Sequence, residues 1–325
     1  MDLPEFRNEP LCDFNGNPEQ FRRMKQALDG VGEKLGHRYP LVIGSERIET
    51  NEKFHSYNPA KQDQVVGTFS QANPELAARA IEKAEEAFET WRFTPAETRG
   101  KLLLSAAKIL RDRKFIYAAW MIYEVGKSWA EADADVAEAI GFCEFYAREM
   151  LRLDGPQPLT PVPGERNRLE YLPLGVGAVI PPWNFPLALL AGNTVALKPS
   201  SDSPTIAFKF WEALEEAGMP PGVVNFLPGP GSTAGNALVA HPRTRFVAFT
   251  GSKEVGLRIN ELAAKPQPGQ IWIKRSSCRY AERRPEMGGL RGRLRELAEE
   301  PRRANWKFRR AGTLIIIWES LGQLV

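Results

Sequence analysis

One apolar run near the middle of the chain constrains the fold most. Residues Gly175–Ile180 are small, apolar or β-branched, and Pro181-Pro182 follow them directly. A short continuous apolar run is typical of a strand that is buried on both faces of a parallel sheet. Because proline cannot donate a ladder hydrogen bond, the strand should end there and place Trp183 and Asn184 on the loop beyond its carboxyl end.

That loop lies where open α/β sheets bind their ligands. An amide such as Asn184, held between prolines and aromatic residues, is placed to donate hydrogen bonds to a developing oxyanion. The alternative is a rigid proline turn with a surface asparagine, which an isolated Pro-Trp-Asn would favour.

Strand and helix patterns alternate through this half of the chain. The expected strands are 174–180, 194–197, 223–227 and 245–249, and the helical segments between the later ones are 203–217, 232–240 and 253–264. This alternation predicts an α/β fold with a doubly wound parallel sheet. Only twelve residues separate Ile180 from Asn193. A crossover between parallel strands needs about a dozen, usually with a helix, so we expect this one to be shortened near 187–192 and to pack abnormally.

The first half of the chain reads as mainly helical. Asn73-Pro74 combines an N-cap with proline at the first helical position, and Thr94-Pro95 repeats the device. The tract from Gly155 to Gly164 contains four prolines and predicts a linker or surface loop. The expected elements are a helix within 15–36, a strand–turn–strand over 39–50, and helices over 74–91, 95–113 and 115–151.

Charge is distributed unevenly along the chain. Residues 1–275 carry a net charge of −2, whereas residues 276–325 carry +5, with ten arginines, one lysine and no aspartate. The basic balance therefore belongs to the last fifty residues and says nothing about the partners of the rest.

Several motifs together resemble the NAD(P)-dependent aldehyde dehydrogenase superfamily. The stretch 123–140 is similar to one branch in particular, the 1-pyrroline-5-carboxylate dehydrogenases, which oxidise glutamate γ-semialdehyde to glutamate. The resemblance covers residues 1 to about 275. The motifs that carry it are Pro173–Pro186, Asn193–Ser200, Gly218–Gly229 and Phe249–Gly256.

The resemblance implies a Rossmann-like cofactor domain that binds NAD. Lys198 ends a strand where a cofactor ribose would lie, although a lysine can also simply close a strand at a loop. Gly251-Ser252 joins a strand to a helix whose free N–H groups could face a diphosphate, although a plain turn would look the same. Gly231 and Gly235 resemble a loop beside the cofactor or a flexible connection. The cofactor-binding residues expected from the resemblance are Ile180, Pro181, Pro182, Trp183, Lys198, Ser200, Gly231, Gly235, Gly251 and Ser252.

The family's reaction needs a cysteine nucleophile, an oxyanion hole and a glutamate that activates water. By resemblance, Asn184 is the oxyanion amide. Glu286 lies in a Glu-Met-Gly-Gly segment that is either the catalytic glutamate or a chance tetrapeptide, because Pro285 and Leu290-Arg291 depart from the family pattern. No segment of the family's Gly-Gln-x-Cys form is present, so we nominate none of the three cysteines as the nucleophile.

Residues 276–325 have two interpretations. They could form a basic helix that binds nucleic acid or acidic lipid, or they could be the translation of a shifted reading frame, which the abrupt loss of resemblance favours. We therefore expect a helical arm (1–38), an incomplete cofactor-binding domain (39–275) and an aberrant tail (276–325), with the catalytic domain missing. The expected function is that of a truncated, inactive NAD-dependent dehydrogenase. The alternative is a non-catalytic nucleotide-binding module with a basic tail.

Composition bears on where the protein is located and on the kinds of partner it could have. The chain start lacks a secretory pattern, no apolar run is long enough to span a bilayer, and the three separated cysteines suggest a reducing compartment. We expect a cytoplasmic protein without a membrane or nucleic-acid partner. In intact relatives the substrate implied by the resemblance is a small aldehyde. His37, His55 and His241 show no metal-ligand spacing, so no metal site is expected. The resemblance implies that relatives form homo-oligomers. Because the carboxyl-terminal part of the family pattern is missing here, we do not extend this expectation to the chain itself.

Overall fold

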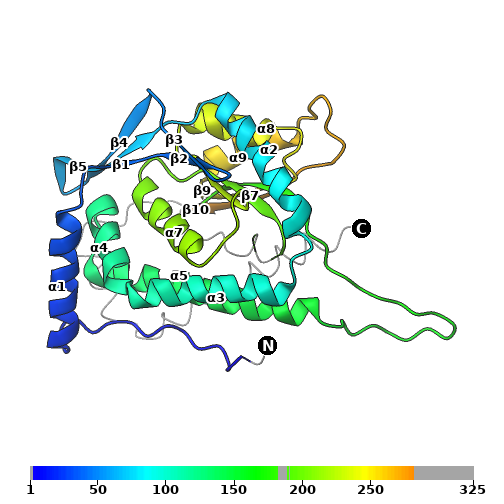
Figure 1. The fold of residues 1–325 in the computed structure, drawn as a ribbon, viewed down its shortest axis with the longest axis horizontal. Coiled ribbons are helices and arrows are strands. Elements are labelled where there is room, and N and C mark those ends of the chain that lie inside the picture. Colours follow the sequence, from blue (N-terminus) through cyan, green and yellow to red (C-terminus); the bar gives the residue numbers. More distant parts are fainter. Residues whose placement is uncertain (1–2, 182–188, 190, 282–325) are drawn as a thin grey trace.

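A seven-stranded sheet forms the centre of the fold (Figure 1). The computed structural model describes residues 3–181, 189 and 191–281. The strand order is β10-β9-β6-β7-β8-β2-β3, and the five strands from β10 to β8 run parallel. The strands are β2 (Leu41–Ile43), β3 (Glu46–Ile48), β6 (Val176–Ile180), β7 (Thr194–Leu197), β8 (Val224–Phe226), β9 (Phe246–Ser252) and β10 (Arg275–Ala281).

Side chains alternate between the two faces of this sheet. On β7, Val195 and Leu197 join one buried cluster and Ala196 joins the other, as the period-two geometry of a strand requires. The first cluster packs against α3, α4, α5 and α7, and the second against α2, α8 and α9. These helices are α2 (Pro74–Trp91), α3 (Ala96–Asp112), α4 (Lys114–Val125), α5 (Trp129–Asp154), α7 (Pro204–Glu216), α8 (Asn236–Ala240) and α9 (Lys253–Ala264). Helices therefore cover both faces, and the predicted doubly wound sheet is confirmed.

Local capping explains where several helices begin. The Asn73 side chain accepts a hydrogen bond from the Leu76 N–H at 2.9 Å, and Pro74 occupies the first turn, as predicted. Thr94 was expected to cap the next helix, but α3 begins at Ala96 and Pro95 takes the cap position without a side-chain hydrogen bond. Thr94 belongs instead to the turn after α2, where its N–H donates to the Trp91 carbonyl at 3.0 Å.

Two expected helices are each divided. The helical pattern over 115–151 forms α4 and α5, because Gly126 adopts a left-handed conformation and Ser128 begins a new helix with a capping box to Glu131. The segment expected as one helix over 232–240 begins with a π-helical turn, η1 (Gly231–Gly235), before α8. π-helical turns are rare, occur mostly within α-helices and often lie at functional sites.

The first hundred residues add an arm, a helix and a second sheet. Helix α1 (Pro18–Gly32) begins at the N-cap Asn17. The predicted strand–turn–strand over 39–50 is the β2–β3 hairpin, which extends the main sheet through the pairing of Val42 with Phe226. The sequence patterns did not predict the smaller three-stranded sheet, in which β5 lies between β1 and β4. Its strands are β1 (His37–Tyr39), β4 (Lys53–Asn58) and β5 (Lys61–Ser70).

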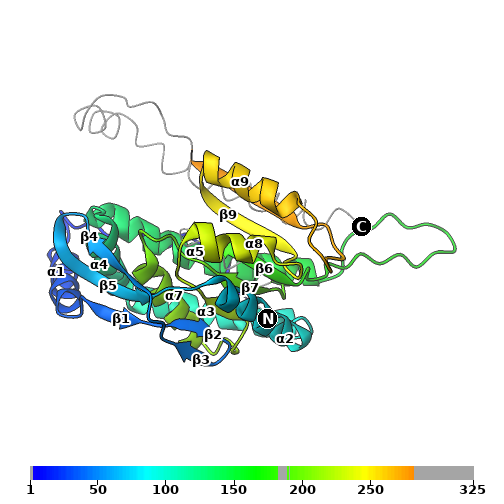
Figure 2. The same cartoon turned by 90° about the horizontal axis from the view of Figure 1, so that it is seen from above.

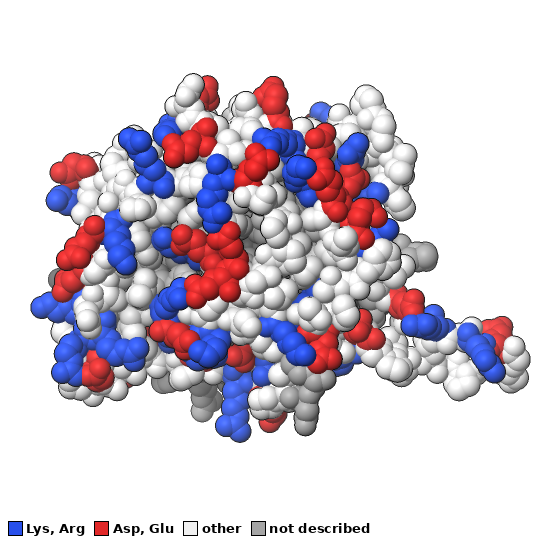
Figure 3. All heavy atoms as spheres, in the orientation of Figure 1, with Lys and Arg blue, Asp and Glu red and all other residues white. Residues whose placement is uncertain are grey.

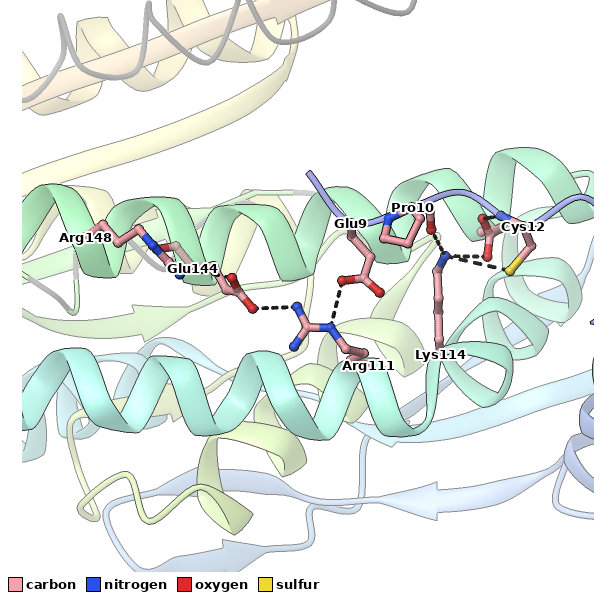
Figure 4. Close-up of polar contacts among 8 residues, drawn as sticks. Glu9, Pro10, Cys12, Arg111, Lys114, Glu144 and Arg148 are labelled. Atoms are coloured by element: carbon pink, nitrogen blue, oxygen red, sulfur yellow. Dashed lines mark hydrogen bonds and ion pairs between the residues drawn. The ribbon is translucent and has the colours of Figure 1, made fainter. Parts of the chain in front are cut away.

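The N-terminal arm lies along the helical layer and is held by charged groups (Figure 4). Arg111 of α3 pairs with both Glu9 of the arm and Glu144 of α5. Deeper in the layer, the buried ammonium group of Lys114 donates to the Pro10 carbonyl at 2.8 Å and lies 2.8 Å from an Asp133 carboxylate oxygen. These contacts attach the extended start of the chain to helices more than ninety residues away in sequence.

Two segments join the sheet to its surroundings. The predicted proline-rich loop after α5 extends away from the body of the molecule (green, Figures 1 and 2). The crossover from β6 to β7 falls largely outside the described residues, but the two strands pair in regular parallel register, from Val176 with Thr194 to Val179 with Leu197. The expected domain boundary after residue 275 falls within β10, whose residues 276–281 pair with β9, and the rest of the tail lies outside the described residues.

Candidate functional site

The order in which the strands join the sheet creates a switch point. β6 comes first in the chain, β7 and β8 are added on one side of it, and β9 and β10 are added on the other. The connections therefore leave the carboxyl edge in opposite directions on either side of β6, so the topological switch point lies between β6 and β9. Open α/β sheets bind ligands at such a switch point, so this edge is the candidate site.

Three strand ends meet at this edge. β6 ends at Ile180, and the buried Pro181 follows it. The Lys198 N–H, just after β7, donates to the Val179 carbonyl of β6 at 2.9 Å. β9 continues to Ser252, three residues beyond the pairing of Phe249 with Ile180. With neighbouring strands about 4.8 Å apart, the ends of β7 and β9 lie about 10 Å from each other across β6.

Lys198 is a buried cation at the end of β7. Its side chain is only 4% exposed, and its ammonium group donates to the Pro199 carbonyl at 2.8 Å. Burial lowers the pKa of Lys198 to about 8, while the carboxylate of Asp202 acts in the opposite direction. No carboxylate hydrogen-bonds this ammonium group among the described residues, so it retains donor capacity for an oxygen-rich ligand.

The η1 turn packs directly against this lysine. A Cβ atom added to Gly235 would lie 3.3 Å from Cδ of Lys198, which is closer than most Cβ atoms approach a neighbouring atom. The Gly235 N–H donates to the Pro230 carbonyl at 3.2 Å, which is the longer hydrogen bond of a π-helical turn. Gly231, at the start of the turn, faces open space, since nothing lies within 4 Å of its added carbon. The absence of a side chain at Gly235 therefore lets the turn pack against the Lys198 stem, and Gly231 leaves open space at the start of the turn.

The start of α9 offers backbone donors at the same edge. β9 leads directly into α9, whose N-cap is the exposed Ser252. The Ser252 hydroxyl accepts from the Val255 N–H at a long 3.4 Å, so this cap is weak, and the first turn of a helix has N–H groups without intrahelical partners. A helix N-terminus with available N–H groups attracts anions, because these groups and the helix dipole both favour negative charge.

A second helix N-terminus at this edge, that of α7, is already occupied. Glu124, at the end of α4, accepts hydrogen bonds from the Thr205 and Ile206 N–H groups of α7 at 2.7 and 2.8 Å. Its carboxylate is 2% exposed, and burial raises its pKa despite these hydrogen bonds. The sequence patterns gave no sign of this contact, which spans eighty residues. Because Glu124 occupies the start of α7, this helix cannot receive an anionic ligand, whereas the start of α9 can.

The other predicted site residues fall into two groups. Ser200 is half-buried beyond β7, and its hydroxyl accepts from the Asp202 N–H at 3.3 Å. Ile180 and Pro181 line the end of β6. Those that lie outside the described residues are Pro182, Trp183, Asn184 and Glu286.

None of the three thiols is activated by its surroundings. Burial raises the pKa of Cys12 to about 11 and that of Cys143 to about 12. Burial also raises the pKa of Cys278, on β10, so its arginine-rich sequence context does not lower it. Nucleophilic attack requires the thiolate, and these environments oppose its formation.

The metal-binding side chains, the helices and the surface charges of the described residues each bear on what the chain could bind. In the part of the chain that the structure describes, no group of three metal-binding side chains comes together. None of the helices in that part is both long and apolar enough to cross a membrane. Basic and acidic side chains are interspersed over the face seen in Figure 3. This face therefore lacks the continuous basic surface that is typical of proteins that bind nucleic acid.

The topology and the edge geometry define the class of protein: a doubly wound α/β protein of the dinucleotide-binding type. A sequence model of the aldehyde dehydrogenase family matches residues 47–274. The chain belongs to the aldehyde dehydrogenase family.

Known proteins similar to the chain give a consistent picture. A 1-pyrroline-5-carboxylate dehydrogenase of Geobacillus thermodenitrificans is 52% identical over 293 residues, which covers 87% of this chain and 55% of that protein. A Thermus 1-pyrroline-5-carboxylate dehydrogenase crystallised with bound NAD is 48% identical, with a TM-score of 0.82 over 86% of this chain and 56% of that one. A Mycobacterium tuberculosis homologue, also with NAD, is 28% identical with a TM-score of 0.79. The chain spans about half the length of the relatives it matches.

Proposed function

We propose that the carboxyl edge of the sheet binds NAD and that the chain is the cofactor-binding portion of an aldehyde-oxidising dehydrogenase. The observation that carries the proposal is the placement of the buried cation Lys198 and the available N-terminus of α9 on either side of β6. This pairing suits a dinucleotide, which presents ribose hydroxyls to one group and a diphosphate to the other.

The proposed roles follow the geometry. Lys198 and Ser200 would hold the adenosine ribose, and Gly251 and Ser252 would lie beside the diphosphate. Gly231 and Gly235 would border the adenosine end, because Gly235 packs against Lys198 and Gly231 faces open space at the start of the same turn. Ile180 and Pro181 would form the floor between them. The roles of Pro182 and Trp183 in the same wall, of Asn184 as the oxyanion amide and of Glu286 as the base remain predictions from the resemblance.

The substrate assignment comes from the relatives. Similar proteins are named 1-pyrroline-5-carboxylate dehydrogenases, so we infer glutamate γ-semialdehyde as the aldehyde and glutamate as the product. When bound, NAD would supply the hydride acceptor. The described residues would bind and orient it and exclude water from one side. We place this chemistry in the cytoplasm, with a small-molecule substrate.

Two measurements on the full chain test the proposal. NAD binding should be detectable by fluorescence titration, whereas a progress curve with NAD and glutamate γ-semialdehyde should stay at the level of the no-enzyme control, because no activated nucleophile is in place. Steady NADH formation above that control would contradict the expected inactivity.

A charge placed at the helix start tests the location of the site. Ser252→Glu puts a carboxylate where the diphosphate would lie, and it should weaken NAD binding about tenfold or more through repulsion. Its matched control is Ser45→Glu in the exposed β2–β3 turn, which should bind NAD normally. Equal affinities of the two variants would place the site elsewhere.

A further inference from the structure

A second cavity lies at the opposite, amino-terminal edge of the sheet. Its volume is about 610 Å³, and it is bounded by the turn between α2 and α3, the end of α5 and the two sides of the loop that follows α5. Pro173, in its wall, precedes β6, whereas the candidate cofactor site lies beyond the end of β6. The five residues of β6 separate the two sites by about 16 Å. This cavity is therefore distinct from the nucleotide site.

Three arginines of the described part of the chain line the cavity, and two of them, Arg92 and Arg99, are available to a ligand because the third, Arg168, is paired with Glu170. Arg99 is 6% exposed, and its guanidinium donates to the Thr94 carbonyl. The Cζ atom of Arg99 lies 3.5 Å from the position that a Cβ atom on Gly192 would take. The guanidinium therefore packs against the backbone just before β7. Burial lowers the pKa of Arg99, and Asp154 partly offsets this effect. A guanidinium in such a site would gain from an additional anionic partner.

Arg92 has a donor without an acceptor. Its Nη2 donates to Glu89 at 2.9 Å, but its Nε is buried and has no hydrogen-bond partner. An unpaired buried donor costs free energy, so a movement of the Arg92 side chain that opened Nε to a ligand oxygen would remove that cost. Among the described residues, the acidic side chains that line the cavity are Asp154 and Glu170, and Glu170 is paired with Arg168.

The rim of the cavity is apolar and exposed to water. Phe93 is 73% exposed and Leu172 is 77% exposed, and Leu159 and Leu169 lie on the same loop with more than 40% of their surface exposed. Large apolar side chains that surround a polar centre are typical of a site for a small amphiphilic molecule, and the cavity volume falls in the usual range for such ligands.

We propose that this cavity binds a small organic monocarboxylate, with its carboxylate on Arg92 and Arg99 and its apolar body against Phe93 and the leucines of the loop. Guanidinium groups bind the planar carboxylate with two parallel hydrogen bonds, and once the Arg92 side chain turns toward the cavity a carboxylate can satisfy its unpaired Nε. The hydrocarbon part would cover apolar surface that is now in contact with water.

Isothermal titration of the full chain with three probes tests the ligand class. Hexanoate should bind saturably at one site, whereas hexan-1-ol, which lacks the charge, and inorganic phosphate, which lacks the apolar body, should each bind at least about tenfold more weakly. Absence of hexanoate binding would overturn the proposal. So would equal binding of hexan-1-ol, which removes the role of the arginines, or of phosphate, which removes the role of the apolar rim.

Variants locate the site without requiring a change at the buried Arg99. Arg92→Met and Leu172→Asp should each weaken hexanoate binding about tenfold or more, because the first removes a donor and the second adds a repelling charge. The matched controls are Arg38→Met and Leu257→Asp, both at exposed positions outside the cavity, and they should bind hexanoate like the wild type. Wild-type affinity in both cavity variants, or a similar loss in the controls, would overturn the assignment.

Discussion

Replacing Lys198 by methionine should make the chain more stable. The pKa of Lys198 falls from 10.5 to about 8 in the folded chain, and each pKa unit corresponds to about 1.4 kcal/mol, so keeping the proton costs about 3 kcal/mol. Methionine keeps an apolar stem against Gly235 but loses the hydrogen bond to the Pro199 carbonyl, worth about 1 kcal/mol. We expect the free energy of unfolding at pH 7 to rise by about 2 kcal/mol.

The pH dependence of this gain identifies its cause. Between pH 8 and 10.5 the unfolded chain binds a proton that the folded chain has released, so the stability contribution of Lys198 improves as the pH rises through this range. Below pH 8 the penalty is complete in the wild type, and near pH 10.5 it has disappeared. The advantage of Lys198→Met should therefore be largest at pH 7 and small at pH 10.5.

Urea unfolding of both proteins at several pH values measures this difference. A variant that is less stable than the wild type at pH 7 would show that the ammonium group stabilises the fold. A stability gain that does not change between pH 7 and 10.5 would show that it arises from packing. Either result would refute the argument that a cation is held at this edge against a desolvation cost.

Three further substitutions test contacts that position the site. Glu124→Ala leaves two α7 N–H groups without an acceptor and should lower the free energy of unfolding by about 2–4 kcal/mol; a loss below 1 kcal/mol would contradict it. Gly177→Ala drives a methyl group into the ring of Phe246 and should cost about 1–3 kcal/mol, whereas Gly231→Ala, facing open space, should leave stability unchanged. Asp133→Ala unpairs a buried ammonium group, so trypsin should release the N-terminal arm faster than in the wild type; an unchanged rate would refute this.

The elements with strong local signals were predictable from the sequence. The apolar strands of the parallel sheet required no long-range information, because burial on both faces leaves a continuous apolar run. The expected 194–197 strand agrees with β7, and the expected 253–264 helix agrees with α9. Asn73-Pro74 likewise carries its own capping chemistry, and the helix after it begins where expected.

The differences arose where another local signal or a distant residue decided the structure. Gly126 and the Ser128–Glu131 capping box divide a continuous apolar pattern, and these short signals outweighed its periodicity. The β4–β5 hairpin was missed because its strands begin with polar residues and acquire buried positions only in the assembled fold. Strands of a small, partly exposed sheet carry a weaker pattern than strands that are buried on both faces.

The candidate site was predictable in its positions but not in its energetics. The strand ends at Lys198 and Ser252 were expected from the sequence and lie at the same edge of the sheet. The burial of Lys198 and the occupation of the α7 start by Glu124 depend on contacts between residues far apart in the chain. Spacing within a sequence does not contain that information, because both effects arise when separate helices pack against one sheet.

The measurement that tests the central claim most directly is the calorimetric titration of NAD into the full chain at pH 7, compared with Lys198→Met. The structure predicts one NAD molecule bound per chain, with an affinity that falls about tenfold or more in the variant, because a charged donor to the ribose is lost. Absence of binding to the wild-type chain, or an affinity that is the same in both proteins, would contradict a nucleotide site at the carboxyl edge of the sheet.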